Sequence, residues 1–258
     1  MDSLEKDLMR IQEALAEAAK VVSAFTPGRI AAEKKAGGDP VTAADFALDK
    51  VLKEMLLGPG EGWLSEETAD NPDRLNKQRV WIVDPIDGTR EFVEGIPEWC
   101  ISVGLVVKGK PVAGGILNPP AGQLFLGSLD TGVTLNGTPA RATDKTTLAG
   151  ARVLASRSEI RKGLWKPLES APFTIVPCGS IAYKLAQVAA GLADATISLA
   201  PKNEWDVAAG AALVAAGGGT TQIKNDPNRL FNRHNTLMDG FTACGQALYT
   251  LLHPFCGH

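Results

Sequence analysis

The sequence contains few of the residues on which several classes of enzyme depend. Only three histidines occur in 258 residues, and two of them lie within the last six positions, so histidine-led catalysis is not expected. The four cysteines form neither a CxxC pair nor a zinc-type spacing: Cys100, Cys178, Cys244 and Cys256. Without an export signal, reduced thiols in a cytoplasmic protein are the expected state.

Charge of one sign and long apolar runs are also lacking. Lys and Arg number 26 against 29 Asp and Glu, so no basic excess favours nucleic-acid binding. No apolar run approaches the roughly 20 residues that span a bilayer. Residues 1–20 are amphipathic and mixed in charge, unlike a signal peptide. We therefore expect a cytoplasmic protein with no nucleic-acid partner and no membrane association.

The composition that is present belongs to a globular protein with a large core. Hydrophobic residues make up 45% of the chain and charged residues 21%. Apolar residues at steps of four and three from Leu4 to Phe25 predict a first helix, with Asp2 as its N-cap. Thr42 and Asp45 have capping-box spacing and predict the start of a second helix.

From Val80 onward the spacing of apolar residues changes from that of helices to that of strands. The first half of the sequence therefore predicts two helices followed by an antiparallel meander. The expected strands are 80–83, 100–107, 111–117, 123–127 and one that meets an Asn136-Gly137 turn. In the second half we expect strands at 153–155, 174–176, 195–199 and 241–244, and helices at 180–190, 206–216 and 246–252. The pattern predicts an α/β (α+β) fold with an N-terminal lobe, 1–149, and a C-terminal lobe, 150–258.

Two aspartates stand at the end of a predicted buried strand in WIVDPIDGTREF, residues 81–92. Asp84 and Asp87 repel each other, and burying them unpaired is costly. Because Pro85 cannot donate a ladder hydrogen bond, we expect the strand to end at Asp84. Two carboxylates on a rigid turn, with the Ile86 carbonyl as a further oxygen, can bind Mg²⁺. An Asp-rich surface turn is the alternative.

The residues after Asp87 and two other acidic segments favour a ligand site. Gly88 lets the backbone approach a ligand closely, and a helix that begins at Thr89 would seat an anion. Glu66-Glu67 follows a short apolar run, as the aspartates do. Asp206 lies near the start of an alanine-rich helix, where it could also be a simple N-cap.

Four ordered segments resemble the inositol monophosphatase family of lithium-sensitive, magnesium-dependent phosphatases. They are GDPVTAAD at 38–45, LSEET at 64–68, WIVDPIDGT at 81–89 and EWDVAAG at 204–210. Their order and spacing cover nearly the whole chain. The resemblance implies a layered αβαβα sandwich of the inositol monophosphatase/fructose-1,6-bisphosphatase type, a homodimer, and a site between the two lobes.

The resemblance also implies two or three Mg²⁺ ions per site. Glu66, Asp84 and the Ile86 carbonyl would bind the first ion, and a weaker third ion is expected near Glu66. Asp84, Asp87 and Asp206 would bind the second. The catalytic residues implied are Asp45, Glu66 and Thr89, with Glu67 and Lys34 in supporting roles. Thr89 Oγ1, hydrogen-bonded to Asp45, would orient the attacking water.

The chemistry fits a phosphatase without the resemblance, because no cysteine, serine or histidine nucleophile stands out. Water can open a phosphate monoester in line with its leaving group when two metal ions, about 3.5–4 Å apart, activate it and stabilise the leaving oxygen. That mechanism needs a cluster of carboxylates. Cations between the aspartates would explain why the like charges tolerate each other.

The sequence leaves the substrate open among small phosphate esters. Arg90-Glu91-Phe92 and Pro40-Val41-Thr42 resemble the 3′(2′),5′-bisphosphate nucleotidase branch, and Glu204-Trp205-Asp206 departs from the Cys/Pro-Trp-Asp common among the inositol enzymes. Ile101–Gly104, in contrast, resembles the inositol enzymes. We expect 3′-phosphoadenosine 5′-phosphate first and an inositol phosphate second. Fructose bisphosphatase, histidinol phosphatase and a non-catalytic binding protein follow. The substrate contacts expected are Gly88, Thr89, Asp87, Asp206, Arg90 and Glu204.

Overall fold

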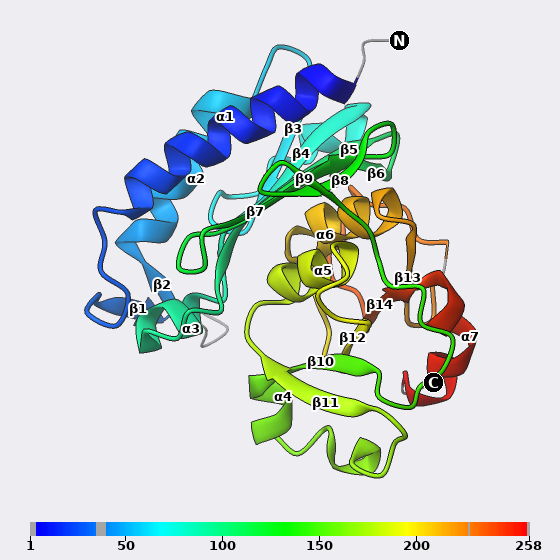
Figure 1. Ribbon diagram of the computed structural model, residues 1–258. Helices are drawn as coiled ribbons and strands as arrows, with labels where there is room; N and C mark the ends of the chain where they lie inside the picture. Colours follow the sequence, from blue (N-terminus) through cyan, green and yellow to red (C-terminus); the bar gives the residue numbers. More distant parts are fainter. Residues whose placement is uncertain (1–3, 35–39, 227, 257–258) are drawn as a thin grey trace.

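The computed structural model describes residues 4–34, 40–226 and 228–256 (Figure 1). The predicted N-cap Asp2, the first two residues of the GDPVTAAD segment and the side chain of Lys34 lie outside this description. Among the described residues, no helix has the length and apolarity required to cross a lipid bilayer.

The main sheet has seven strands in the order β3-β4-β5-β6-β7-β8-β9. β3 is parallel to β4, and the remaining neighbours are antiparallel, as the predicted meander requires. The strands are β3 (Gly62–Ser65), β4 (Arg79–Asp87), β5 (Cys100–Val107), β6 (Lys110–Asn118), β7 (Gln123–Ser128), β8 (Gly132–Leu135) and β9 (Thr138–Ala140).

A second sheet of five strands has the order β11-β10-β12-β14-β13. Its strands are β10 (Arg152–Ser156), β11 (Thr174–Cys178), β12 (Ala195–Ser198), β13 (Gly219–Ile223) and β14 (Phe241–Gly245). A small antiparallel pair, β1 (Ala32–Lys34) and β2 (Pro40–Thr42), precedes the second helix.

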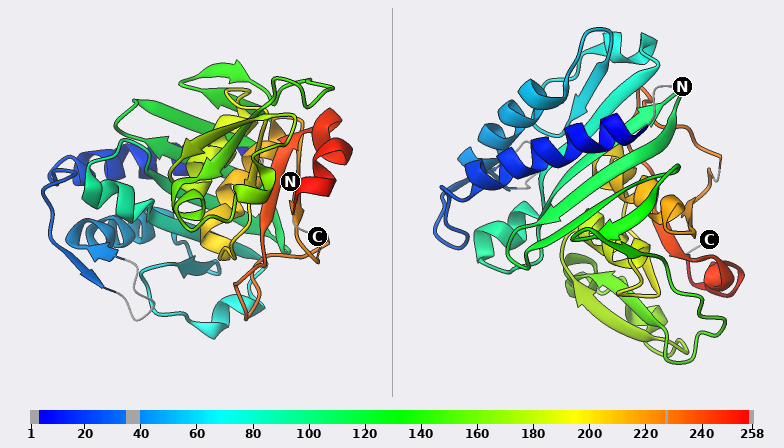
Figure 2. Two further views of the ribbon diagram at one scale, coloured as in Figure 1. Left: turned by 90° about the horizontal axis from the view of Figure 1, so that it is seen from below. Right: turned by 45° about the horizontal axis from the view of Figure 1, so that its top comes forward.

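The helices complete an αβαβα sandwich, which confirms the predicted fold. α1 (Leu4–Val22) and α2 (Ala43–Leu56) cover one face of the main sheet, and α5 (Ile181–Ala189) and α6 (Glu204–Ala216) lie between the two sheets (Figures 1 and 2). The shorter helices are α3 (Thr89–Glu94), α4 (Arg157–Arg161) and α7 (Tyr249–Leu252), with 3-10 turns at 72–76, 166–168, 246–248 and 253–255.

The central helix α6 is buried along almost its whole length because it packs between two sheets. Small residues make this close packing possible. A Cβ on Gly104 would lie 2.8 Å from the Ala209 nitrogen, and one on Gly210 would lie 2.4 Å from the Leu185 Cβ. One core cluster contains β4, β5 and β6 side chains together with α5 and α6 side chains. The division at 149/150 remains a prediction.

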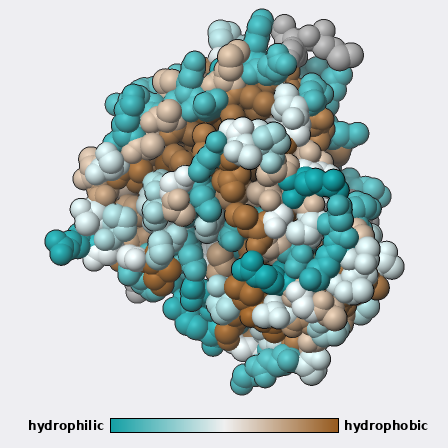
Figure 3. All heavy atoms as spheres, viewed as in Figure 1, coloured by the Kyte–Doolittle hydropathy of each residue, from teal (hydrophilic) through white to brown (hydrophobic). Residues whose placement is uncertain are grey.

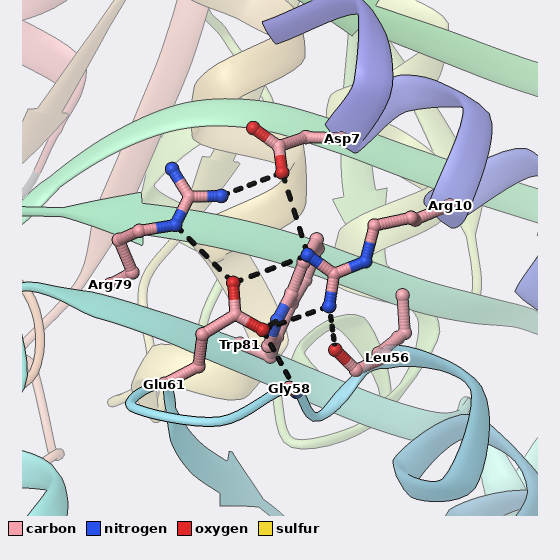
Figure 4. A network of polar contacts seen from close by, with 7 residues as sticks. All are labelled: Asp7, Arg10, Leu56, Gly58, Glu61, Arg79 and Trp81. Atoms are coloured by element: carbon pink, nitrogen blue, oxygen red, sulfur yellow. Dashed lines mark hydrogen bonds and ion pairs between the residues drawn. The ribbon is translucent and has the colours of Figure 1, made fainter. Parts of the chain in front are cut away.

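A network of charged side chains ties α1 to the main sheet (Figure 4). Arg10 pairs with Glu61 at 2.8 Å, and Arg79 pairs with Asp7 at 2.6 Å. Trp81 Nε1 donates to Glu61 at 2.9 Å. Burial raises the pKa of Glu61, but the hydrogen bonds from Arg10 and Trp81 outweigh it and lower that pKa to about 2. The network therefore fixes the start of β4, whose other end carries the two aspartates.

Candidate active site

Three carboxylates from separate parts of the chain meet at the end of β4. Glu66 follows β3, Asp84 lies on β4, and Asp206 lies in the first turn of α6; one oxygen of each lies within 4.8 Å of the others. Asp84 is 1% exposed, and neither of its carboxylate oxygens has a hydrogen-bond partner in the described part of the chain. An unpaired buried carboxylate is costly, so the arrangement fits a bound cation.

Burial and the neighbouring negative charges disfavour the ionised forms of Asp84 and Asp206. Burial raises the pKa of Asp84 well above its usual range, and Glu66 and Asp87 add to the effect. Burial, with the charge of Asp87, raises the pKa of Asp206 to about 8. Without a cation, the protonated forms of Asp84 and Asp206 are therefore favoured, and a divalent cation would favour their ionised forms. Hard carboxylate and carbonyl oxygens are the ligands that Mg²⁺ prefers.

The topology explains why Glu66 and the aspartates are neighbours. β3 and β4 are parallel, with Ser65 beside Val83, so both chains leave the sheet at the same edge. The predicted end of the strand at Asp84 is wrong. β4 continues to Asp87, which pairs with Cys100, and an irregularity between Asp84 and Asp87 lets Pro85 lie within the strand.

Asp87 is held by the start of α5. Its Oδ2 accepts hydrogen bonds from Ser180 Oγ at 2.6 Å and from the Ala182 amide at 2.5 Å. Ser180 is the N-cap of α5 and has a φ of 51°. Such a conformation costs about 1–3 kcal/mol in a non-glycine residue. Sequence reasoning missed Ser180, although a serine directly before a helical pattern is a typical capping signal.

Thr89 and Asp45 lie in contact, as the resemblance implies. Thr89 Oγ1 donates to the Ile86 carbonyl at 2.9 Å and lies 3.2 Å from Asp45 Oδ1. The other Asp45 oxygen accepts from the Thr42 amide at 2.8 Å and from Thr42 Oγ1 at 2.6 Å. These bonds form the predicted capping box of α2 and fix the carboxylate that faces Thr89.

Gly88 allows the chain to turn from β4 into α3. Its φ is 94°, a conformation that favours glycine, and a Cβ there would lie 3.1 Å from the Glu98 carbonyl. The backbone of Gly88 and Thr89 consequently borders the cavity beside Asp87.

A cavity of about 360 Å³ opens over the acidic residues. Among the described residues, the basic ones that line it are Arg90, Lys162, Lys184 and Lys202. Lys184 is only 2% exposed, and burial lowers the pKa of its ammonium group. No hydrogen bond or ion pair within the described chain engages that group. Sequence reasoning identified Arg90 but missed the three lysines. Lys184 lies within a helix, and Lys162 and Lys202 lie in connecting segments, so no local pattern shows that they border one cavity.

The structure contradicts the substrate contact predicted for Glu204. This side chain is fully buried and accepts hydrogen bonds from the Asn232 amide at 2.6 Å and the Arg233 amide at 3.0 Å. Residues two positions apart on a helix point roughly 200° apart, so Glu204 faces away from the cavity that Asp206 lines. Asp206 is also not the N-cap of α6, since Asn203 holds that position and donates its amide to Asp206 at 2.7 Å.

Glu67 is the remaining supporting residue that the structure describes. Its side chain is half-buried beside Glu66, and its amide donates to Ser65 Oγ at 3.4 Å. It does not line the cavity over the acidic residues.

The chain matches the family described as "Inositol monophosphatase family" over residues 4–253. It is 34% identical over 199 residues to inositol monophosphatase 3 of Solanum lycopersicum, covering 72% of this chain and 74% of the relative. It is 28% identical over 243 residues to Nus factor SuhB of Pseudomonas aeruginosa, covering 87% of both.

Solved structures agree with this fold. The inositol monophosphatase from Anabaena (Nostoc) sp. PCC 7120 superposes with a TM-score of 0.79 at 26% identity, over 97% of this chain and 95% of that one. CysQ from Bacteroides thetaiotaomicron gives a TM-score of 0.77 at 24% identity, over 93% and 97% of the two chains, and supports the fold alone.

Proposed function

Because the chain belongs to the inositol monophosphatase family, whose members hydrolyse phosphate monoesters, we propose that it is a Mg²⁺-dependent, Li⁺-inhibited phosphomonoesterase. The observation that carries this proposal is the cluster of Glu66, Asp84 and Asp206 beside a cavity that Glu66 and Asp206 line. A buried carboxylate without a partner is explained when a cation lies beside it.

The same residues supply the proposed ligands. One Mg²⁺ would be bound by Glu66, Asp84 and the Ile86 carbonyl. A second would be bound by Asp84, Asp87 and Asp206. A third would lie near Glu66. When bound, Mg²⁺ supplies activation of water and neutralisation of the phosphate charge. Asp87 is already oriented by its two hydrogen bonds from the start of α5.

Thr89 and Asp45 orient the nucleophilic water in this proposal. Thr89 Oγ1 has one hydrogen and lies within hydrogen-bond distance of both the Ile86 carbonyl and Asp45 Oδ1. If the Ile86 carbonyl binds a cation as proposed, the hydroxyl would donate to Asp45 instead, and a lone pair of Oγ1 could accept a hydrogen bond from water. Asp45 cannot turn away, because Thr42 holds its other oxygen through two hydrogen bonds. The backbone N–H groups of Gly88 and Thr89 would contact the phosphate.

We favour a 3′(2′),5′-bisphosphate nucleotide such as 3′-phosphoadenosine 5′-phosphate as the substrate. The support is the basic wall of the cavity, above all the buried ammonium group of Lys184. A second phosphate would offer a direct ion pair, which this group does not form with the nearby carboxylates of Asp87 and Glu159. Arg90, from the first turn of α3, borders the same space.

An inositol phosphate is the second candidate. Relatives named inositol monophosphatase reach 34% identity over 72% of this chain. Such a substrate has a neutral leaving group, so it would leave the basic wall of the cavity without a charged partner.

The test is phosphate release from a panel of monoesters, with and without Mg²⁺, by the wild type and three variants. Lys184→Met and Arg90→Ala should lower kcat/KM for 3′-phosphoadenosine 5′-phosphate. Loss of a charge-assisted hydrogen bond of about 1.5–3 kcal/mol corresponds to roughly tenfold to a hundredfold. Turnover of inositol 1-phosphate should change little. Lys50→Met, an exposed lysine of α2, is the matched control.

The outcomes distinguish the proposed substrate from the proposed phosphatase activity. Equal losses on both substrates, or none on either, would remove the basic wall as a specificity element and favour inositol phosphate. No Mg²⁺-dependent release from any monoester would contradict the phosphatase itself.

We also propose a homodimer. Hydrophobic side chains gather along the middle of the face shown in Figure 3, over the region of β7 and α5 in Figure 1. Burial of apolar surface of this kind drives association. Analytical ultracentrifugation at several protein concentrations tests it, and a monomer at every concentration would contradict it.

A further inference from the structure

We propose that Glu98 and Arg157 are positioning residues for the metal site, because their ion pair holds the turn that orients Asp87. The inference rests on the proposed function, since it concerns the same cations. Glu98 lies between α3 and β5, whereas Arg157 is the first residue of α4 in the second half of the chain.

The ion pair between Arg157 and Glu98 is bidentate. Arg157 Nε donates to Glu98 Oε2 at 2.5 Å, and Nη2 donates to Oε1 at 2.6 Å. Paired bonds of this kind fix direction as well as distance. Burial raises the pKa of Glu98, but the hydrogen bonds from Arg157 and the Gly179 amide outweigh it and lower that pKa. Glu98 therefore remains an acceptor throughout the neutral range.

The same carboxylate also binds the chain next to Ser180. Glu98 Oε2 accepts a hydrogen bond from the Gly179 amide at 2.6 Å. The backbones are in close contact as well, since a Cβ on Gly179 would lie 2.7 Å from the Glu98 carbonyl. The Glu98 carboxylate therefore holds the Gly179 amide, and the absence of a side chain on Gly179 lets the two backbones approach closely.

Ser180 transmits this constraint to the metal ligand. Its φ of 51° is disfavoured for serine, so the backbone keeps it only while its neighbours fix it. In that conformation Ser180 Oγ reaches Asp87 at 2.6 Å, and α5 begins where the Ala182 amide donates to the same oxygen. Without the hold on Gly179, both donors to Asp87 lose their fixed position.

The contacts form one path from Arg157 through Glu98, Gly179 and Ser180 to Asp87. Groups that orient a metal ligand typically change metal affinity or activity about 10–100-fold when they are removed. The ion pair of Glu98 and Arg157 is one contact further from the metal ligand than Ser180 is. We therefore expect its loss to weaken cation binding about tenfold, at the lower end of that range.

Mn²⁺ binding, followed by electron paramagnetic resonance without substrate, provides a readout independent of turnover. Glu98→Gln keeps the shape of the side chain and an acceptor for Gly179, but loses the charge. Arg157→Gln removes the other partner. The matched control is Arg141→Gln, which breaks an ion pair with Asp144 whose side chains are 71% and 78% exposed. Circular dichroism and the Tm check that each variant is folded.

We expect about tenfold weaker Mn²⁺ binding for Glu98→Gln and Arg157→Gln, and no change for Arg141→Gln. Ser180→Ala should weaken binding similarly. The loss in the double variant Glu98→Gln/Ser180→Ala should be smaller than the product of the two single losses, because both changes weaken the hydrogen bond from Ser180 to Asp87.

Wild-type Mn²⁺ affinity in folded Glu98→Gln and Arg157→Gln, even with a lowered Tm, would overturn the inference and leave the pair a purely structural contact. Losses that multiply in the double variant would also overturn it. Failure of the wild-type protein to bind Mn²⁺ would instead overturn the proposed function, and this inference with it.

Discussion

Replacing Asp206 by asparagine should stabilise the metal-free protein, and the gain should grow with pH. The unfolded carboxyl ionises near its usual value of 3.8, whereas the folded one keeps its proton up to about pH 8. Between these values the unfolded state binds fewer protons, so the free energy of unfolding falls as the pH rises. Asparagine cannot ionise and has no such dependence.

The magnitude follows from the difference between the two pKa values of Asp206. One pKa unit corresponds to about 1.4 kcal/mol, so the gain is at most about 2 kcal/mol at pH 5 and about 4 kcal/mol at pH 7. For a protein of this size the value at pH 7 corresponds to a rise in Tm on the order of 10 °C. The side-chain oxygen of the introduced asparagine would still accept the hydrogen bond from the Asn203 amide, so the start of α6 should persist.

The assay is differential scanning calorimetry in EDTA at pH 5, 7 and 8, repeated with excess Mg²⁺. Asp144→Asn is the control, because the Asp144 side chain is 78% exposed and its change should not depend on pH in this range. With excess Mg²⁺ the wild type should become the more stable of the two proteins, because it would bind the ion through the Asp206 carboxylate, which the variant lacks. A gain for Asp206→Asn that is equal at pH 5 and pH 8, or a loss at pH 8 in EDTA, would refute the reasoning.

Three further predictions concern activity. Asp84→Asn should lower kcat by orders of magnitude with an unchanged circular dichroism spectrum, since it alters a ligand proposed to be shared by two ions; wild-type turnover at saturating Mg²⁺ would exclude that role. Thr89→Ala should lower kcat with KM little changed, because it removes only the hydroxyl that we propose orients the water. Steady-state kinetics showing a raised KM with normal kcat would make Thr89 a substrate contact only. LiCl should inhibit phosphate release more than NaCl of equal ionic strength, because Li⁺ resembles Mg²⁺ in size but carries half its charge, and identical inhibition curves would contradict this.

Much of the fold could be predicted because its elements are strongly periodic. The stripe of α1, the capping box of α2 and the hairpin of β5 and β6 all follow from local spacing. β13 was missed, since it lies at the edge of its sheet and its Thr-Thr-Gln sequence is half-exposed. Edge strands carry a weak apolar signal.

The sequence likewise revealed some residues of the candidate site and not others. Asp84 and Asp87 stand out because acids rarely follow a buried strand, and the resemblance supplied Glu66 and Asp206. Lys184 did not stand out, because a lysine in an amphipathic helix is normally solvated. Contacts between distant segments, such as those of Glu98 with Arg157 and of Glu204 with residues 232–233, leave no local pattern in the sequence.

The burial of α6 between two sheets also limits how such a protein can diversify. Its close contacts with Gly104 and with Leu185 leave no lateral room, so substitutions along its length would be rejected from both sides. Asp206 lies in the first turn of this closely packed helix. The basic residues of the cavity come instead from α3, from α5, from the residue after α4 and from the loop before α6. We therefore expect that substitutions among these basic residues change which phosphate ester is preferred without disturbing the proposed cation ligands.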